Sequence, residues 1–221
     1  MLMNNQFISE IISEKSNKFK IDIIDNNKQT IGYLSPITYS CLNNSLLLKK
    51  LTKWRNLAKK AFLTQFKATS ERTKTWLENV VLNDNKRILF IIYEQETPVG
   101  HIGFINLNDK SAELDNLIKG EKSNNPSIIY HAEISLIKWI FCKFGIENIT
   151  GRVLSTNFIA LNLHKTVGFK VYEEVLLLKK SVDSEIHYEE ITNLDCQNEE
   201  SGISLKKIKI NYEDFVNFHQ I

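Results

Sequence analysis

The spacing of hydrophobic residues changes several times along the chain, and each change predicts a different element. Between positions 7 and 12, apolar residues recur at the spacing of one helix face, which predicts a short helix. Apolar and polar residues alternate in 19–23, and 30–34 is again extended after a polar turn, so a β-hairpin is expected. The first 30 residues are therefore interpreted as a helix and hairpin extension.

Two helices are predicted next, each with an N-terminal signal. Asn43 or Asn44 is placed to cap a helix whose leucines follow at helical spacing. A second helix is expected to begin near Thr69 or Ser70. Three short and largely apolar segments follow, and the brief turns between them predict an antiparallel meander. These strands are expected at 87–93, 99–106 and 112–118.

A long amphipathic helix is predicted to begin with Asn125 as its N-cap and Pro126 in its first turn. Its apolar stripe runs to Phe144, and Gly145 is the expected C-cap. A strand, a short helix and three further strand-like segments follow, at 149–155, 157–166, 171–178, 185–191 and 205–210. A strand–helix–strand unit after a meander predicts an α/β fold with one sheet of mixed strand direction.

Composition and charge exclude several classes of protein. The 221 residues are 43% hydrophobic and 24% charged, which is typical of a globular chain rather than a disordered one. The net charge of +2, with only four arginines, gives no reason to expect nucleic-acid binding. Cys41, Cys142 and Cys196 form no C-x-x-C pair, so we expect neither a disulfide framework nor a bound metal.

No segment indicates insertion into a membrane. The N-terminus lacks a basic region followed by a long apolar stretch, so a signal peptide is not expected. The longest apolar run, 88–93, is far too short to span a bilayer. We therefore expect a soluble cytoplasmic protein in a reducing compartment.

The connection before the long helix is a candidate anion site. A helix N-terminus offers unpaired N–H groups and the positive end of the helix dipole, a combination that binds phosphate. The N–H groups expected to point outward are those of Ser127, Ile128 and Ile129, and the nearby Lys119 adds positive charge. An ordinary strand–helix connection is the alternative interpretation of the same residues.

Several motifs, in the correct order, resemble one family of enzymes. Residues 155–169, STNFIALNLHKTVGF, resemble the C-terminal half of the GNAT acetyltransferase superfamily. Residues 98–104, PVGHIGF, look like the third strand of that family. The stretch Trp54-Arg55-Asn56 and the later Thr69, Glu71 and Trp76 resemble its N-terminal helices, in the RimJ/RimL-like branch with ribosomal-protein and amino-sugar acetyltransferases.

The resemblance divides the chain into three parts. It covers residues 31–192, which are interpreted as the acetyltransferase domain. Residues 1–30 and 193–221 exceed this domain, and the second of these segments is expected to be a strand-like tail packed on it. The implied GNAT fold is a mixed, mostly antiparallel sheet whose central parallel strands splay apart, flanked by helices.

The resemblance further implies that acetyl-CoA lies between the splayed strands, with its pantetheine paired along the fourth strand and its pyrophosphate at the long helix. The aligned stretch 124–129 departs from the family's (Q/R)-x-x-G-x-(G/A) loop, because the Arg or Gln and the glycines are missing. The residues implied to bind acetyl-CoA are Leu117, Ile118, Lys119, Asn124, Ser127, Ile128, Ile129, Asn157, Asn162 and Lys165.

Acetyl transfer to an amine requires a base for the ammonium proton and a proton for the departing thiolate. Glu113, on the presumed fourth strand, is the candidate base. His164 stands where the family commonly has a tyrosine that protonates the thiolate. The backbone N–H of Leu117 or Ile118 is the expected donor to the thioester oxygen. Solvent-facing carboxylates and a histidine at the edge of the core are the structural alternatives.

The acceptor is inferred from the resemblance. The strand Glu-Leu-Asp-Asn, 113–116, followed by Lys-Gly looks like acetyltransferases associated with surface-polysaccharide sugars. This implies direct attack, in a ternary complex, by the amine of a nucleotide-linked amino-deoxysugar. Asp115 shares the strand face of Glu113, whereas Asn116 is expected to point to the other face. The implied substrate-binding residues are Trp54, Arg55, Asn56, Asp115 and Asn116.

Other interpretations stay open at this point. Trp54 fits the end of a core helix as well as the wall of an acceptor pocket. A protein N-terminal acetyltransferase is the alternative enzyme. A non-catalytic acyl-CoA-binding or sensing module is the alternative from another class, and the sequence does not decide whether the protein is a homodimer.

Overall fold

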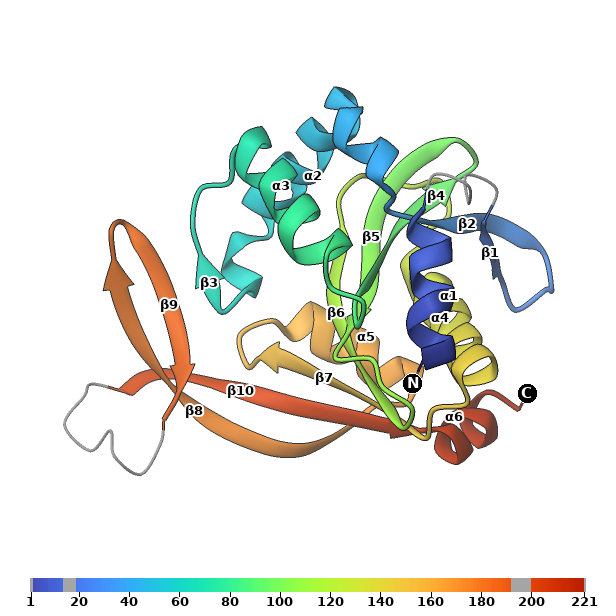
Figure 1. Ribbon diagram of the computed structural model, residues 1–221. Helices are drawn as coiled ribbons and strands as arrows, with labels where there is room; N and C mark the ends of the chain where they lie inside the picture. The colour runs from blue at the N-terminus through green and yellow to red at the C-terminus, as the bar shows by residue number, and fades with distance from the viewer. Residues whose placement is uncertain (1, 14–18, 192–199, 221) are drawn as a thin grey trace.

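The computed structural model describes residues 2–13, 19–191 and 200–220, so Cys196 lies outside the described residues. Within these residues, ten strands form one sheet in the order β1-β2-β4-β5-β6-β7-β10-β8-β9-β3 (Figure 1). They are β1 Ile21–Ile24, β2 Thr30–Pro36, β3 Thr64–Gln65, β4 Ile88–Glu94, β5 Thr97–Ile105, β6 Ser111–Lys119, β7 Asn148–Leu154, β8 Lys170–Val182, β9 Glu185–Glu190 and β10 Glu200–Asn211. Only β6 and β7 pair in parallel; the other pairs are antiparallel. The predicted mixed sheet is confirmed.

In the part of the chain that the structure describes, six α-helices accompany the sheet: α1 Leu2–Ile12, α2 Ser45–Leu57, α3 Ser70–Trp76, α4 Ile128–Phe144, α5 Phe158–Val167 and α6 Tyr212–His219. Short turns η2 (Tyr39–Asn43) and η3 (Lys59–Ala61) flank α2, and the π-helical η4 (Leu77–Leu82) continues α3. Two of the predicted caps are present. The Asn44 side chain accepts from the Leu47 N–H, and the Thr69 side chain accepts from the Arg72 N–H.

The start of the long helix differs from the prediction. α4 begins at Ile128 with Ser127 as N-cap, so Pro126 lies in the preceding turn and Asn125 is not the cap. Asn125 instead forms that turn. Its side-chain oxygen accepts from the N–H of Ser127 at 3.0 Å, and its carbonyl oxygen accepts from the N–H of Ile128 at 3.3 Å. These two bonds close the turn before the helix can begin, which places the helix start later than the proline pattern indicates.

Helices cover both faces of the sheet, which explains why the first five residues of β4 are all buried. α4 packs over β1, β2 and β4, and η4 packs against β4. α1 rests on α4 through Phe7, whose ring contacts those of Trp139 and Phe144. Among the described helices, none combines the length and apolar character needed to cross a bilayer.

The parallel pair at the centre of the sheet separates along its length, as expected for splayed strands. β6 and β7 pair only from Ser111↔Asn148 to Leu114↔Gly151. Beyond these residues the two strands run apart (Figure 1). The gap between them therefore opens beside Asp115 on β6 and Arg152 on β7, which makes it the candidate location of the site.

The C-terminal strands are part of the same sheet. β10 lies between β7 and β8 and pairs with β7 over the whole of Asn148–Leu154. β9 pairs with the short β3, which follows α2, through Thr64↔His187 and Gln65↔Ile186. The segment after α2 is thereby held against the C-terminal hairpin. The domain limits at 30/31 and 192/193 stay predictions, although β1 and β10 both belong to this one sheet.

Candidate active site

A β-bulge interrupts β6 where the strand leaves β7. Asn116 has a backbone φ of 54°, and the pairing with β5 jumps from His101↔Ile118 to Gly103↔Asp115. The imidazole Nδ1 of His101 donates to the carbonyl oxygen of Asn116 at 2.6 Å and holds the bulge in place. Burial lowers the pKa of His101 to about 4, and the positive charge of Arg55 acts in the same direction, so the ring is neutral at neutral pH.

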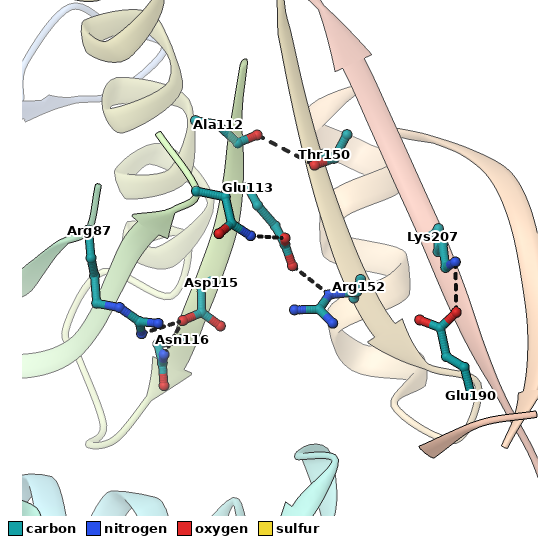
Figure 2. A network of polar contacts seen from close by, with 10 residues as sticks. Arg87, Ala112, Glu113, Asp115, Asn116, Thr150, Arg152, Glu190 and Lys207 are labelled. Carbon is teal, nitrogen blue, oxygen red and sulfur yellow. Dashed lines mark hydrogen bonds and ion pairs between the residues drawn. The ribbon is translucent and has the colours of Figure 1, made fainter. Parts of the chain in front are cut away.

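Asp115 lies directly before the bulge. The Arg87 guanidinium approaches its carboxylate at 3.4 Å, and the Asn116 amide donates to the same oxygen (Figure 2). Burial raises the pKa of Asp115, and Arg87 offsets only part of this effect. A carboxyl group with a raised pKa beside a strand gap is suited to proton transfer.

Glu113 is held differently. One oxygen accepts from Arg152 Nε on β7 at 2.5 Å, and the other accepts from the Asn106 amide at 2.9 Å. Figure 2 shows Glu113 reaching across to Arg152 while Asp115 faces Arg87. Because each oxygen of Glu113 already accepts a strong hydrogen bond, the structure favours Asp115 over Glu113 as the base.

The predicted orientation of Asn116 is wrong. A regular strand would place Asn116 and Asp115 on opposite faces, yet the Asn116 amide contacts the Asp115 carboxylate. The left-handed backbone at Asn116 turns its side chain to the side of Asp115. The bulge therefore brings both residues to one place, together with Arg87.

His164 lies on α5, whose N-cap follows shortly after the end of β7. Its Nδ1 is 2.6 Å from a carboxylate oxygen of Glu133 on α4, and both side chains are buried. Glu133 was not among the site residues predicted from the sequence. A signal was present, because Glu133 interrupts the apolar face of a helix whose neighbouring turns are buried Ile129, Leu136 and Ile137.

Most N–H groups of the loop expected to hold pyrophosphate already donate to acceptors within the protein. Asn125 engages the N–H groups of Ser127 and Ile128, so the prediction that both point outward is wrong. The carboxylate of Glu94, at the end of β4, accepts the N–H groups of Asn124 and Asn125 at 2.8 and 2.7 Å. A cavity of about 610 Å³ lies beside Glu94 and residues 124–126, away from Glu113 and Asp115.

Replacing Glu94 by alanine is expected to raise the KM for acetyl-CoA at least about tenfold, because hydrogen bonds to a charged group contribute about 1.5–3 kcal/mol each and the loop loses two of them. Steady-state kinetics measure this, with Glu96→Gln as the matched control, since Glu96 contacts Tyr33 and not the loop. A lower KM in Glu94→Ala would instead show that Glu94 competes with the cofactor for the loop.

Trp54 and Asn56 stabilise the fold, through core packing and backbone hydrogen bonds respectively. Trp54 is fully buried, its indole N–H donates to Glu121 at 3.1 Å, and a Cβ on Gly120 would lie 2.1 Å from the ring. This placement favours the core interpretation of Trp54 over a pocket wall. Asn56 binds both backbone groups of Ala68, at 3.0 and 2.8 Å, and so fixes the segment between α2 and α3.

Arg55 differs from its two neighbours. Its guanidinium lies over the rings of Phe62 and Phe66 and donates to the carbonyl oxygen of Thr64 at 2.7 Å. NH1 is buried and has no hydrogen-bond partner among the described residues. Burial, assisted by the charge of Arg72, lowers the pKa of Arg55 to about 10, so the side chain stays cationic at neutral pH.

The other predicted cofactor residues are distributed along the two sides of the strand gap. Leu117, Ile118 and Lys119 continue β6 beyond the bulge. On the far side, the Asn157 side chain caps α5 by accepting from the Ala160 N–H at 3.3 Å, while Asn162 and Lys165 are exposed on α5. The gap thus suits an extended thioester chain, whereas the loop at 124–129 offers fewer N–H groups than expected.

Metal ligands do not gather at this site. Among the described residues, no group of three or more His, Cys, Asp or Glu side chains is arranged to hold a metal ion. Cys41 and Cys142 are both free thiols.

The sequence is similar to known acetyltransferases. The family described as acetyltransferase (GNAT) domain matches residues 44–187. Acetyltransferase PseH of Campylobacter jejuni strain 81-176 is 25% identical over 135 residues, which are 59% of this chain and 82% of that protein. The PseH of strain NCTC 11168 is 24% identical over the same shares.

Two solved structures show the same fold at low identity. A spermidine N-acetyltransferase from Vibrio cholerae, in complex with CoA and spermine, has a TM-score of 0.62 at 15% identity, covering 85% of this chain and 99% of that one. RimL, a ribosomal L7/L12 alpha-N-protein acetyltransferase, has a TM-score of 0.63 at 12% identity, covering 87% and 94%. Since the family match spans more than half of the sequence, the chain belongs to the GNAT family and is an N-acetyltransferase.

Proposed function

We propose that the protein transfers the acetyl group of acetyl-CoA to the primary amine of a nucleotide-linked amino-deoxysugar, by direct attack in a ternary complex. The resemblance of 113–116 to sugar acetyltransferases supports this acceptor class. Carboxylates at the bulge suit an acceptor that brings hydroxyl groups and an ammonium group to the same place.

The observation that carries the nucleotide part is the buried NH1 of Arg55, which has no partner in the described chain. A buried guanidinium N–H without a partner is costly, and guanidinium groups bind phosphate well. Because NH1 is closed to solvent, a phosphate oxygen would reach it only after the side chains around Arg55 move. Arg55 lies near enough to His101, which holds the bulge, for its charge to lower the pKa of that ring. An anionic acceptor therefore complements this side of the site.

The residues take the following roles in the proposal. Asp115 removes a proton from the acceptor ammonium, and the Arg87 contact fixes its carboxylate. The backbone N–H of Leu117, in the bulge, donates to the oxygen that becomes negative during the attack. His164 returns a proton to the sulfur. Acetyl-CoA itself supplies the activated acyl group.

Replacing Arg55 by alanine tests the nucleotide assignment. We expect the KM for a nucleotide-linked amino-deoxysugar to rise at least about tenfold, because truncating one member of a buried charge pair costs about 2–5 kcal/mol or more. The KM for the same amino sugar without its nucleotide serves as the internal control and is expected to change little. An equal loss for both acceptors would remove Arg55 from nucleotide binding.

The fold relatives suggest other acceptors, and charge argues against one of them. The spermidine N-acetyltransferase acts, by its description, on a polyamine, which is a polycation. Arg55 and Arg72 lie close enough together to lower the pKa of Arg55, and they would repel such an acceptor. A peptide α-amine, as for RimL, stays an alternative outcome of the acceptor test.

A further inference from the structure

The buried pair formed by Glu133 and His164 joins α4 to α5. Glu133 has no exposed surface, and the His164 side chain retains 7%. The 2.6 Å contact uses one carboxylate oxygen of Glu133, and the second oxygen has no hydrogen-bond partner among the described residues. Toward the described residues, the His164 ring forms a hydrogen bond through Nδ1 alone, and the Glu133 side chain is fully buried.

A carboxylate in this position is difficult to explain as packing alone. Burying a charge is costly unless it is paired, and pairs of this kind are weak evidence for stability. The neighbours of Glu133 on the buried side of α4, Ile129, Leu136 and Ile137, are apolar, and an apolar residue would fit among them. The role of Glu133 is therefore expected to lie in its effect on His164.

We propose that Glu133 is a positioning residue that holds His164 with its proton on Nδ1 and its Nε2 available to the reaction. This inference rests on the proposed function, because it concerns the group that protonates the leaving thiolate. A carboxylate that accepts from Nδ1–H fixes both the tautomer and the ring orientation. It also stabilises the positive charge when the ring carries a second proton.

The proton balance is as follows. Neutral His164 carries its proton on Nδ1, and Nε2 takes a proton from solvent to give the imidazolium. When the C–S bond of the tetrahedral adduct breaks, the sulfur receives the electron pair of that bond. The Nε2–H bond then breaks and an S–H bond forms, so the ring returns to its neutral form. The Nδ1–H···Glu133 bond persists throughout, and Glu133 does not itself transfer a proton.

Two aromatic residues, Phe169 and Tyr130, also interact with this pair. The Phe169 ring packs edge-on against His164, with the ring centroids 5.6 Å apart. Tyr130, one turn before Glu133 on α4, feels the charge of Glu133, which adds to the effect of burial in raising the pKa of Tyr130. A purely structural link between α4 and α5 is the competing explanation, and it predicts effects on stability rather than on turnover.

A double-mutant cycle separates the two explanations. Glu133→Gln keeps the shape but removes the charge, and His164→Asn keeps a donor at the Nδ1 position but removes Nε2. We expect Glu133→Gln to lower kcat about tenfold with the KM for acetyl-CoA unchanged. In the His164→Asn background the same change is expected to have no further effect on kcat. Equal losses in both backgrounds would overturn the positioning role.

Nitrogen-15 NMR of the histidine side chains gives a readout that needs no activity. With the ring in its neutral form, wild-type protein is expected to show His164 as the Nδ1–H tautomer, and Glu133→Gln to show a mixture. An Nε2–H tautomer in wild-type protein would contradict the proposal even if a variant failed to fold. If no amine is acetylated, the proposed function fails, while the tautomer still decides the geometry of this pair.

Discussion

Replacing Asp115 by asparagine is expected to lower kcat/KM about 100-fold at neutral pH, the lower end of the ~10²–10⁴-fold range for acid–base catalysis. Burial raises the pKa of Asp115, so its carboxyl group stays protonated to a higher pH than an ordinary aspartate. The base is active only when ionised. In wild-type protein kcat/KM therefore rises with pH through this raised pKa, and in Asp115→Asn that rise is expected to disappear.

Glu113→Gln is the matched control for this prediction. Both oxygens of Glu113 are engaged by Arg152 and Asn106, so we expect this variant to lose less than about tenfold and to keep the acidic limb of the pH profile. The pH dependence of kcat/KM for the three proteins is the measurement. If Glu113→Gln lost the limb and Asp115→Asn retained it, Glu113 would be the base.

Replacing His164 by asparagine is expected to lower kcat about 100-fold, while the KM for acetyl-CoA changes less than about threefold. Asparagine places an amide N–H near the position of Nδ1 and so keeps a donor for Glu133. Phenylalanine would leave the buried Glu133 carboxylate without a partner and threaten the fold, because breaking a buried pair costs about 3–5 kcal/mol.

Steady-state kinetics with saturating acceptor check this expectation, and Thr166→Ala, an exposed position on the same helix that is not among the predicted site residues, is the control. An unchanged kcat in His164→Asn, with the control also unchanged, would show that the place of the family's tyrosine is not used for proton transfer here.

The fold was predictable where local signals agree with tertiary packing. Asn44 and Thr69 both cap helices where hydrogen-bonding side chains precede apolar periodicity. The signal from Pro126 was misleading, because the Asn125 side chain forms its own turn and delays the helix. The place of β10 between β7 and β8 was not predictable, since strand order depends on long-range pairing that a local pattern does not encode.

The candidate site was predictable only in part, because contacts between residues far apart in the sequence are not encoded in a local pattern. Strand alternation placed Asp115 on the same face as Glu113, which was the predicted base, and a family motif pointed to His164. The roles of these residues stay predictions. Glu133 and Glu94 were missed, because each acts on a residue about thirty positions away. The bulge at Asn116 was missed too, because the pattern of 112–118 predicts an unbroken strand, although Asn adopts the left-handed conformation more often than most residues do.

The proposed acceptor is the amine of a nucleotide-linked amino sugar. The most direct test is mass spectrometry of acceptors incubated with acetyl-CoA and wild-type protein: a nucleotide-linked amino-deoxysugar, spermidine, a short peptide with a free α-amine, and no acceptor. The proposed function predicts a single acetyl group on the sugar amine, and this product is expected to be absent with Asp115→Asn at equal protein concentration. Acetylation of the peptide or spermidine alone, or CoA binding without any acetylated product, would contradict it.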